Sequence, residues 1–233
     1  MVKLSEKVLI FALTVFSFGW LNLQTLYAEK SFEDENPTIT VAASREEMVD
    51  GFKSIGISDD TANQLAQKVI SGELIDSRNP VYDNIAPSVE IKSDYLYYAE
   101  YTYPDGSKKI VSVNMNRGAG ISGGTTVTGD VYYQVSGATV YGSYGDVSMS
   151  FTASYRSATT SANIISITNV SAGSVYYNPK VAYGTTTNTV ACGGAQYTIG
   201  SGTSSGAYYL QLNVPAALGS AYAGMMYQGP NIH

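Results

Sequence analysis

The chain of 233 residues has one cysteine, Cys192, and one histidine, His233, which is its last residue. A single cysteine excludes an intramolecular disulfide, and we expect this small side chain to be buried between turn glycines. A terminal histidine cannot serve the serine–histidine chemistry of a hydrolase, and with Cys192 alone it cannot complete a zinc site. We therefore expect no catalytic residue and no metal site.

Charge is scarce in the C-terminal half, where Asp130, Asp146, Arg156 and Lys180 are the only charged side chains after Gly118. The formal net charge of −6 arises from the N-terminal half. An acidic chain cannot neutralise many phosphates, so we expect no nucleic acid as a partner. A region so poor in titratable groups also lacks the acids and bases of most active sites, and we expect no enzyme and no cofactor.

The N-terminus has one apolar run, residues 8–21, preceded by Lys3 and Lys7. The run is too short for a membrane-spanning helix, which needs about 20 apolar residues. A basic head, an apolar stretch of this length and a small residue after it are the parts of a secretory signal peptide. We predict a signal peptide over residues 1–28, cleavage after Ala28 and an extracellular mature chain. Export without disulfides fits a Gram-positive envelope.

After the cleavage point, residues 29–43 are polar and acidic and are expected to form a flexible leader. Two helix signatures follow. Ser44 and Glu47 have the spacing of a capping box, and Ser58 is the expected N-cap of a second helix with an apolar stripe. We predict a helical hairpin over residues 44–75. It is too small to bury its apolar stripes alone, so it packs on the β region, on a second copy or on a partner.

A short box, GELIDSRNP at residues 72–80, ends the hairpin, and a YPDGS turn follows at residues 103–107. This order resembles an uncharacterised family of small secreted Firmicute proteins. In that family a helical G-E-x-x-D-S-x-x-P segment precedes a tyrosine-rich strand, a Y-P-D-G-S turn and a Gly/Ser/Thr/Tyr-rich β domain. The likeness covers roughly residues 45–230, although Leu74-Ile75 stand where an aromatic residue usually precedes the aspartate. It implies export and this layout, and no catalytic residues.

From about residue 87 the hydrophobic period changes to two. Expected strands lie at 95–103, 109–115, 131–135, 147–156, 164–170, 175–177, 181–190, 208–214 and 221–227. One-sided alternation predicts antiparallel sheets with one buried face. We predict a mainly β fold, an antiparallel β-sandwich or barrel over residues 87–233, which follows the helical hairpin through a linker at 76–86.

Two glycine motifs overlap in NRGAGISGG, residues 116–124. Gly118-x-Gly120-x-x-Gly123 has the spacing of a dinucleotide loop, and Gly120-x-Ser122-x-Gly124 that of a nucleophile elbow. Both require a helix directly after the loop. Because strand-like, β-branched residues follow instead, we interpret this stretch as a turn.

Acidic residues give two weaker motifs. Asp130 and Asp146 each stand in a Gly-Asp-Val sequence, where we expect turn hydrogen bonds to the backbone, with calcium binding as the alternative. Glu90, Asp94 and Glu100 alternate with tyrosines. We expect a solvated strand face there, and a glycosidase pair is the alternative.

Tyrosine is abundant, with 20 tyrosines against 6 phenylalanines. Tyrosine, serine, glycine and asparagine together are typical of adaptable contact surfaces. In the strand at 206–214 we expect one set of side chains to face inward, Tyr208, Leu210, Leu212 and Val214. The set expected to face solvent as candidate ligand contacts is Tyr209, Gln211 and Asn213.

These observations favour a secreted, non-enzymatic protein that binds another protein or a cell-envelope glycan at or near the cell surface. An envelope-directed β toxin or bacteriocin-like protein is the alternative, because residues 147–170 could form an amphipathic hairpin of the kind that inserts into membranes. Only this alternative involves membrane contact. A cell-wall hydrolase is the second alternative.

Overall fold

The computed structural model describes residues 44–115, 120–125, 129–172, 177–187, 190–199 and 206–228. The predicted signal peptide, the predicted leader and His233 lie outside these ranges. Within these ranges the chain begins with two α-helices, α2 (Arg45–Ser54) and α3 (Asp59–Ile70), followed by two 3-10 helices, η1 (Asp76–Arg78) and η2 (Pro80–Tyr82). Within the described ranges, no helix combines the length and apolar character needed to cross a membrane.

The helical hairpin forms as predicted, and its caps are those expected from the sequence. The Ser44 hydroxyl accepts the N–H of Glu47, while the Glu47 carboxylate accepts the N–H of Ser44, which completes the capping box of α2. The Ser58 side chain caps α3. Each helix is followed by a glycine with positive φ, +78° at Gly56 and +80° at Gly72, a conformation that favours glycine.

In the described part of the chain, sheet A contains seven strands: β1 (Val89–Lys92), β2 (Leu96–Thr102), β3 (Lys108–Asn114), β4 (Gly120–Thr125), β5 (Val131–Ser143), β6 (Ser148–Ala158) and β7 (Ala162–Ala172). Their order is β1-β2-β3-β5-β6-β7. The second half of β5 pairs with β3 and its first half pairs with β4, so β4 continues the line of β3 along β5. Residues 120–124 were predicted to be part of a turn, and that prediction is wrong because they pair with β5 as a strand. Residues 116–119 lie outside the described part.

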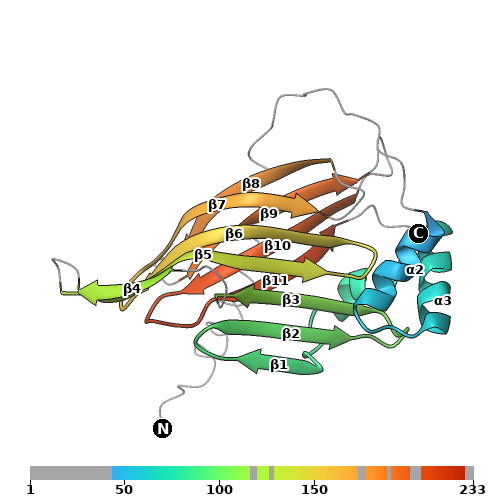
Figure 1. Ribbon diagram of the computed structural model, residues 1–233, viewed down its shortest axis with the longest axis horizontal. Helices are drawn as coiled ribbons and strands as arrows, with labels where there is room; N and C mark the ends of the chain where they lie inside the picture. Colours follow the sequence, from blue (N-terminus) through green and yellow to red (C-terminus); the bar gives the residue numbers. More distant parts are fainter. Residues whose placement is uncertain are drawn as a thin grey trace, which may run out of the picture.

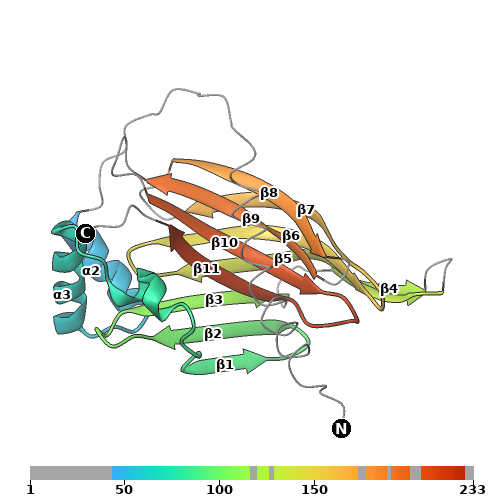
Figure 2. The same cartoon turned by 180° about the vertical axis from the view of Figure 1, so that it is seen from behind.

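The described residues form four strands of sheet B, β8 (Tyr177–Thr187), β9 (Val190–Ile199), β10 (Gly206–Pro215) and β11 (Tyr222–Gln228), in the order β11-β10-β9-β8. All pairings within both sheets are antiparallel. The two sheets stay separate and pack face to face, as the two opposite views show (Figures 1 and 2). The mainly β prediction is confirmed, and the described strands form a sandwich rather than a closed barrel.

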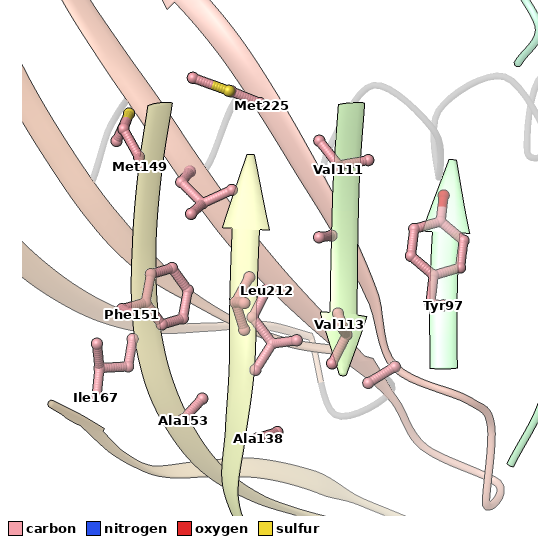
Figure 3. Packing of buried hydrophobic residues seen from close by; sticks show 14 of the residues in the cluster. Tyr97, Val111, Val113, Ala138, Met149, Phe151, Ala153, Ile167, Leu212 and Met225 are labelled. Atoms are coloured by element: carbon pink, nitrogen blue, oxygen red, sulfur yellow. The ribbon is translucent and has the colours of Figure 1, made fainter. Parts of the chain in front are cut away.

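The main core lies between the sheets and is built from alternate residues of their strands (Figure 3). Sheet A contributes Met149 and Phe151 of β6, and sheet B contributes Leu212 of β10 and Met225 of β11, all at most 2% exposed. Burying such a side chain stabilises the fold by roughly 1.5–3 kcal/mol. The alternation read from the sequence therefore identifies the buried face of these strands.

The helical hairpin packs against one end of the sandwich, opposite the end at which β4 lies (Figures 1 and 2). Its own small core includes Phe52 and also contacts the partly buried Ile110 of β3. The turn between β5 and β6 approaches α2 closely. A Cβ added to Gly51 would lie 2.6 Å from the carbonyl oxygen of Gly145. Of the three packing options left open by the sequence, the described contacts show packing on the chain's own β region.

Residues 76–86, predicted as a linker, include η1 and η2, and η1 is tied to the turn between β2 and β3. The N–H of Asp76 donates to Oδ2 of Asp105, and the N–H of Asp105 donates to Oδ2 of Asp76, both at 3.0 Å. The N–H of Ser77 donates to the hydroxyl of Ser107 at 3.0 Å. The GELIDSRNP box and the YPDGS turn are therefore direct partners in the fold.

Candidate binding surface

The strand that carries the predicted contact residues is β10. Its inward set, Tyr208, Leu210, Leu212 and Val214, is at most 1% exposed, as predicted. The outward set is also buried, with Tyr209 at 7%, Gln211 at 8% and Asn213 at 8% exposure. The prediction that these three side chains face solvent is wrong.

The position of β10 within sheet B gives the physical reason. This strand has hydrogen-bonded neighbours on both sides, β9 and β11, so its outward side chains are flanked from two directions. Met226 lies directly across from Tyr209, and the Gln211 amide donates to Oδ1 of Asn213. Burial raises the pKa of the Tyr209 phenol. The three residues share a face, but their side chains are too enclosed to be the first choice for a contact surface.

The two Gly-Asp-Val aspartates join separate segments. Asp146 forms an ion pair with Arg78, and the two side chains are 5% and 7% exposed. Asp130 accepts hydrogen bonds from the hydroxyls of Thr159 and Thr160. In the described part of the chain, no three His, Cys, Asp or Glu side chains come together in a way that could hold a metal ion. Cys192 falls within β9, and its side chain lies outside the description.

The acidic residues of the first strands do not form a pair. Glu90 is opposite Ala99 and Glu100 is opposite Val89, so the two carboxylates point to opposite faces of sheet A. Lys108 donates to Glu100 at 2.7 Å and is the main cause that lowers the pKa of this carboxyl group. Glu90 forms an ion pair with Lys92. Glu90 and Glu100 therefore cannot act together on one glycosidic bond.

The outward side of β5, β6 and β7 carries hydroxyl and amide groups at nearly every position, and we call it the hydroxyl face. Its side chains are Tyr132, Gln134, Thr139 and Tyr141 on β5, Ser148, Ser150, Thr152, Ser154 and Arg156 on β6, and Asn163, Ser166, Thr168 and Ser171 on β7. They are exposed or half-buried, whereas most of the residues between them face the core. No labelled helix or strand lies in front of these strands in Figure 1.

The strand register arranges the hydroxyl face in rows. Across the three strands the rows are Thr139–Thr152–Thr168, Tyr141–Ser150–Ser171 and Gln134–Arg156–Asn163. Neighbouring strands lie about 4.8 Å apart, and outward residues of one strand follow one another at about 6.6 Å. The result is a two-dimensional array of hydrogen-bond donors and acceptors.

Register shifts interrupt these strands and are accompanied by local hydrogen bonds. One shift lies between Val135 and Ala138 on β5, where Gly137 has φ +83° and its N–H donates to the Ser154 hydroxyl. On β7, Asn169 has φ +51° and its amide contacts the Thr152 hydroxyl at 3.4 Å. An extra residue in one strand pins the pairing, because a slip would misplace the bulge. The rows are thus held in one register.

Arg156 is stacked on an aromatic ring at one end of the hydroxyl face. Its guanidinium carbon lies 3.8 Å from the centroid of the Tyr132 ring. Tyr132 is paired with Gly124 of β4, and a Cβ on that glycine would lie 3.4 Å from the Tyr132 hydroxyl. Gly124 of β4 therefore leaves room for the Tyr132 ring. The ring in turn supports Arg156, the only basic residue among those of the hydroxyl face.

The sequence predicts strands at 147–156 and 164–170 and, in the toxin alternative, a membrane-inserting hairpin over 147–170, but it does not predict a contact surface on these strands. The available signal was the hydroxyl side chain at four successive outward positions, Ser148, Ser150, Thr152 and Ser154. The rows themselves depend on pairing with β5 and β7, which a single strand cannot reveal.

Comparison with known proteins adds no relative to this description, because no family model, no curated protein and no solved structure matches the chain.

Proposed function

We propose that this chain is a secreted, non-enzymatic protein that binds a cell-envelope glycan through the hydroxyl face. The observation that carries the proposal is the array of hydroxyl and amide rows on β5, β6 and β7. A sugar polymer presents hydroxyl groups at regular intervals, and such an array offers it matching donors and acceptors.

Two properties of the face suit a sugar ligand. Serine, threonine, asparagine and glutamine supply adaptable hydrogen bonds, while the rings of Tyr132 and Tyr141 supply contact area with little entropy to lose. Residues 131–172 contain only one acidic side chain, and this Asp146 is buried against Arg78. The hydroxyl face therefore carries no carboxylate that would compete with a sugar for its hydrogen-bond donors.

The same composition supports a role without catalysis. Residues 131–172 contain no histidine, lysine, glutamate or cysteine. General acid–base chemistry needs a titratable side chain within hydrogen-bond reach of the reacting proton. A face made of hydroxyl groups, amides and one arginine binds ligands without offering such a group at neutral pH.

Secretion is supported by the signal peptide features of residues 1–28. In a Gram-positive host, we expect the extracellular protein to begin at Glu29. Mass spectrometry of the N-terminal peptide from the culture medium measures this directly. Recovery of the chain with Met1 retained in the membrane fraction would contradict both cleavage and release.

Binding is tested by co-sedimentation of the mature chain with isolated Gram-positive cell walls. The variant Thr139→Val/Thr152→Val removes two hydroxyls of one row while keeping side-chain shape. The matched control is Thr102→Val, an exposed threonine on the outward side of β2. We expect the double variant to bind the walls at least about tenfold more weakly and the control to bind normally. Equal binding by all three folded proteins would remove the hydroxyl face as the site.

A membrane-active toxin is the second candidate because of the length of strands β6 and β7. Strands β6 and β7 each have 11 residues, which is within the roughly 9–11 residues that cross a bilayer as a strand. Their apolar face forms part of the core, so insertion would require the two sheets to separate. Release of dye from liposomes of bacterial lipid would favour this candidate. Release of soluble fragments from peptidoglycan would favour a hydrolase.

A further inference from the structure

We propose that Arg156, held on the Tyr132 ring, makes the hydroxyl face selective for polymers that carry an anionic oxygen group on a hydroxylated backbone. The group is a carboxylate or a phosphodiester. This inference rests on the proposed function and adds the chemical class of the ligand to it.

The first step is the orientation of the guanidinium group. The Arg156 guanidinium carbon stands 3.8 Å from the Tyr132 ring centroid, close enough for a cation–π contact. An arginine stacked in this way keeps its N–H donors in the plane of the guanidinium group, where they can form two parallel hydrogen bonds to an anion. Stacking also limits the side-chain freedom that would otherwise be lost on binding.

The second step is the charge around this side chain. Arg156 forms no ion pair with a carboxylate of the described residues. The acid that precedes β5, Asp130, accepts hydrogen bonds from Thr159 and Thr160 in the turn after β6. The other acid of the hairpin region, Asp146, is occupied by Arg78. The positive charge of Arg156 is therefore available to a ligand.

The third step is the set of neighbours in the same row. Gln134 of β5 and Asn163 of β7 lie directly opposite Arg156, one on each side. Ser122 of β4 lies opposite Gln134 and extends the row. Each amide offers two N–H donors. The guanidinium group on the Tyr132 ring and the amide residues at the two neighbouring positions of its row all supply N–H donors for an anionic group, and the hydroxyl rows remain to contact the polymer around it.

The experiment uses two pairs of polymers whose members differ in charge. The first pair is polygalacturonate and its full methyl ester, which tests a carboxylate. The second pair is poly(glycerol phosphate) and polyglycerol, which tests a phosphodiester. Binding of the mature chain to each immobilised polymer is measured for the wild type, Arg156→Gln, Arg156→Lys and Lys92→Gln. The last variant removes one exposed positive charge from the edge strand β1 and is the matched control.

In at least one pair, we expect the wild type to bind the anionic polymer about tenfold or more tightly than the neutral one, as a charge-assisted hydrogen bond allows. Arg156→Gln should reduce this ratio to about one, Arg156→Lys should keep part of it because the charge remains without the planar fork, and Lys92→Gln should keep all of it. The pair that shows the preference identifies the anionic group.

Each other outcome overturns a defined statement. Equal affinity of the wild type for both members of both pairs, or an unchanged ratio in folded Arg156→Gln, overturns this inference and leaves the proposed function standing. Absence of binding to all four polymers and to cell walls overturns both. Thermal unfolding of each variant tests whether it is folded. The comparison of charged and neutral polymers with the wild type alone tests the inference even if a variant does not fold.

Discussion

Asp76 and Asp105 each accept the backbone N–H of the other on one carboxylate oxygen, both at 3.0 Å. This reciprocal pair joins the end of the helical segment to the turn between β2 and β3. The N–H of Ser107 donates to Oδ1 of Asp105, and the amine of Lys68 in α3 forms an ion pair with Oδ2 of Asp105 at 3.2 Å. The segment between the hairpin and the sandwich is therefore fixed by specific hydrogen bonds.

A double-mutant cycle on Asp76 and Asp105 measures this pair. Each single change to alanine leaves a part-buried N–H without its acceptor, so each should lower the free energy of unfolding by about 1–3 kcal/mol. The double variant should lose less than the sum, because the two bonds hold the same two backbone segments together and the loss of one lets the segments move apart and weakens the other. Urea unfolding measures all four proteins, and Asp94→Ala in the exposed turn after β1 is the control. Strict additivity would show that the two bonds act independently, and single variants as stable as the control would contradict the reciprocal pair.

Arg78 of η1 contacts the turn between β5 and β6 and strand β10 of sheet B. It forms its ion pair with Asp146 and stands 5.7 Å from the ring centroid of Tyr144 and 5.4 Å from that of Tyr208. Arg78→Met should cost about 3–5 kcal/mol because it leaves the Asp146 carboxylate buried without its cation. Arg78→Met combined with Asp146→Leu should recover much of that loss. A double variant less stable than Arg78→Met, measured by urea unfolding, would show that the arginine acts mainly through other contacts.

Gly51→Ala tests the docking of α2. Alanine should favour the helix by up to about 1 kcal/mol, yet its Cβ would lie 2.6 Å from the Gly145 carbonyl oxygen. We expect a net loss of stability, because the hairpin must move away from the turn between β5 and β6. The control is Gln64→Ala, at an exposed position of α3, which should be neutral or slightly stabilising. A rise in the melting temperature of Gly51→Ala would contradict this close approach.

Lys109 makes the free energy of unfolding depend on pH in the alkaline range. Burial lowers its pKa to about 8, although Asp83 acts in the opposite direction, and its amine lies 4.4 Å from the Tyr101 ring centroid. The unfolded chain keeps a pKa of about 10.4, so it binds more protons than the folded chain between about pH 8 and this value, and stability rises with pH there. Below about pH 8 the cost of burying the charge is fully present.

Lys109→Met should therefore be more stable than the wild type at neutral pH, and its advantage should vanish as the pH approaches about 10.4. Tyrosines also titrate in this range, but they are common to both proteins and cancel in the difference. Urea unfolding of both proteins across the range measures it. A difference that does not change with pH would show that the lysine amine stays charged in the folded protein.

Tyr209→Ala is now expected to be costly, in contrast to what the sequence suggested for a solvent-exposed ring. With 7% of its surface exposed, loss of the side chain should lower the free energy of unfolding by about 3–5 kcal/mol. The comparison is Tyr95→Ala, whose ring is 52% exposed and whose loss should stay within about 0.5 kcal/mol. Equal melting temperatures for these two variants would mean that the Tyr209 ring is not enclosed in solution.

The features that the sequence predicts well are those set by neighbouring residues. The capping box of Ser44 and Glu47 spans three positions, and the structure forms it as expected. The inward face of β10 follows from strict alternation between Tyr208 and Val214. In both cases the physical cause lies within one turn of helix or one strand, so a local pattern is sufficient.

The features that the sequence misses depend on partners far along the chain. Glycine-rich β4 has little intrinsic strand preference and is a strand because β5 pairs with it. Burial of Tyr209 depends on the strands beside β10, and the Arg78–Asp146 pair joins residues 68 positions apart. The hydroxyl face requires the register of three strands, including their bulges, before its rows become visible.

The two sheets also follow one another in the chain. Every described strand of sheet A lies within residues 89–172, and every described strand of sheet B lies within residues 177–228. When the chain emerges from a channel N-terminus first, the strands of sheet A can pair with one another, and the helical hairpin can pack on them, before sheet B has emerged. This is possible because no described strand of sheet B lies within sheet A. Until sheet B has folded onto sheet A, the apolar face around Phe151 is exposed to other chains. We expect this intermediate to be the stage of folding most prone to aggregation.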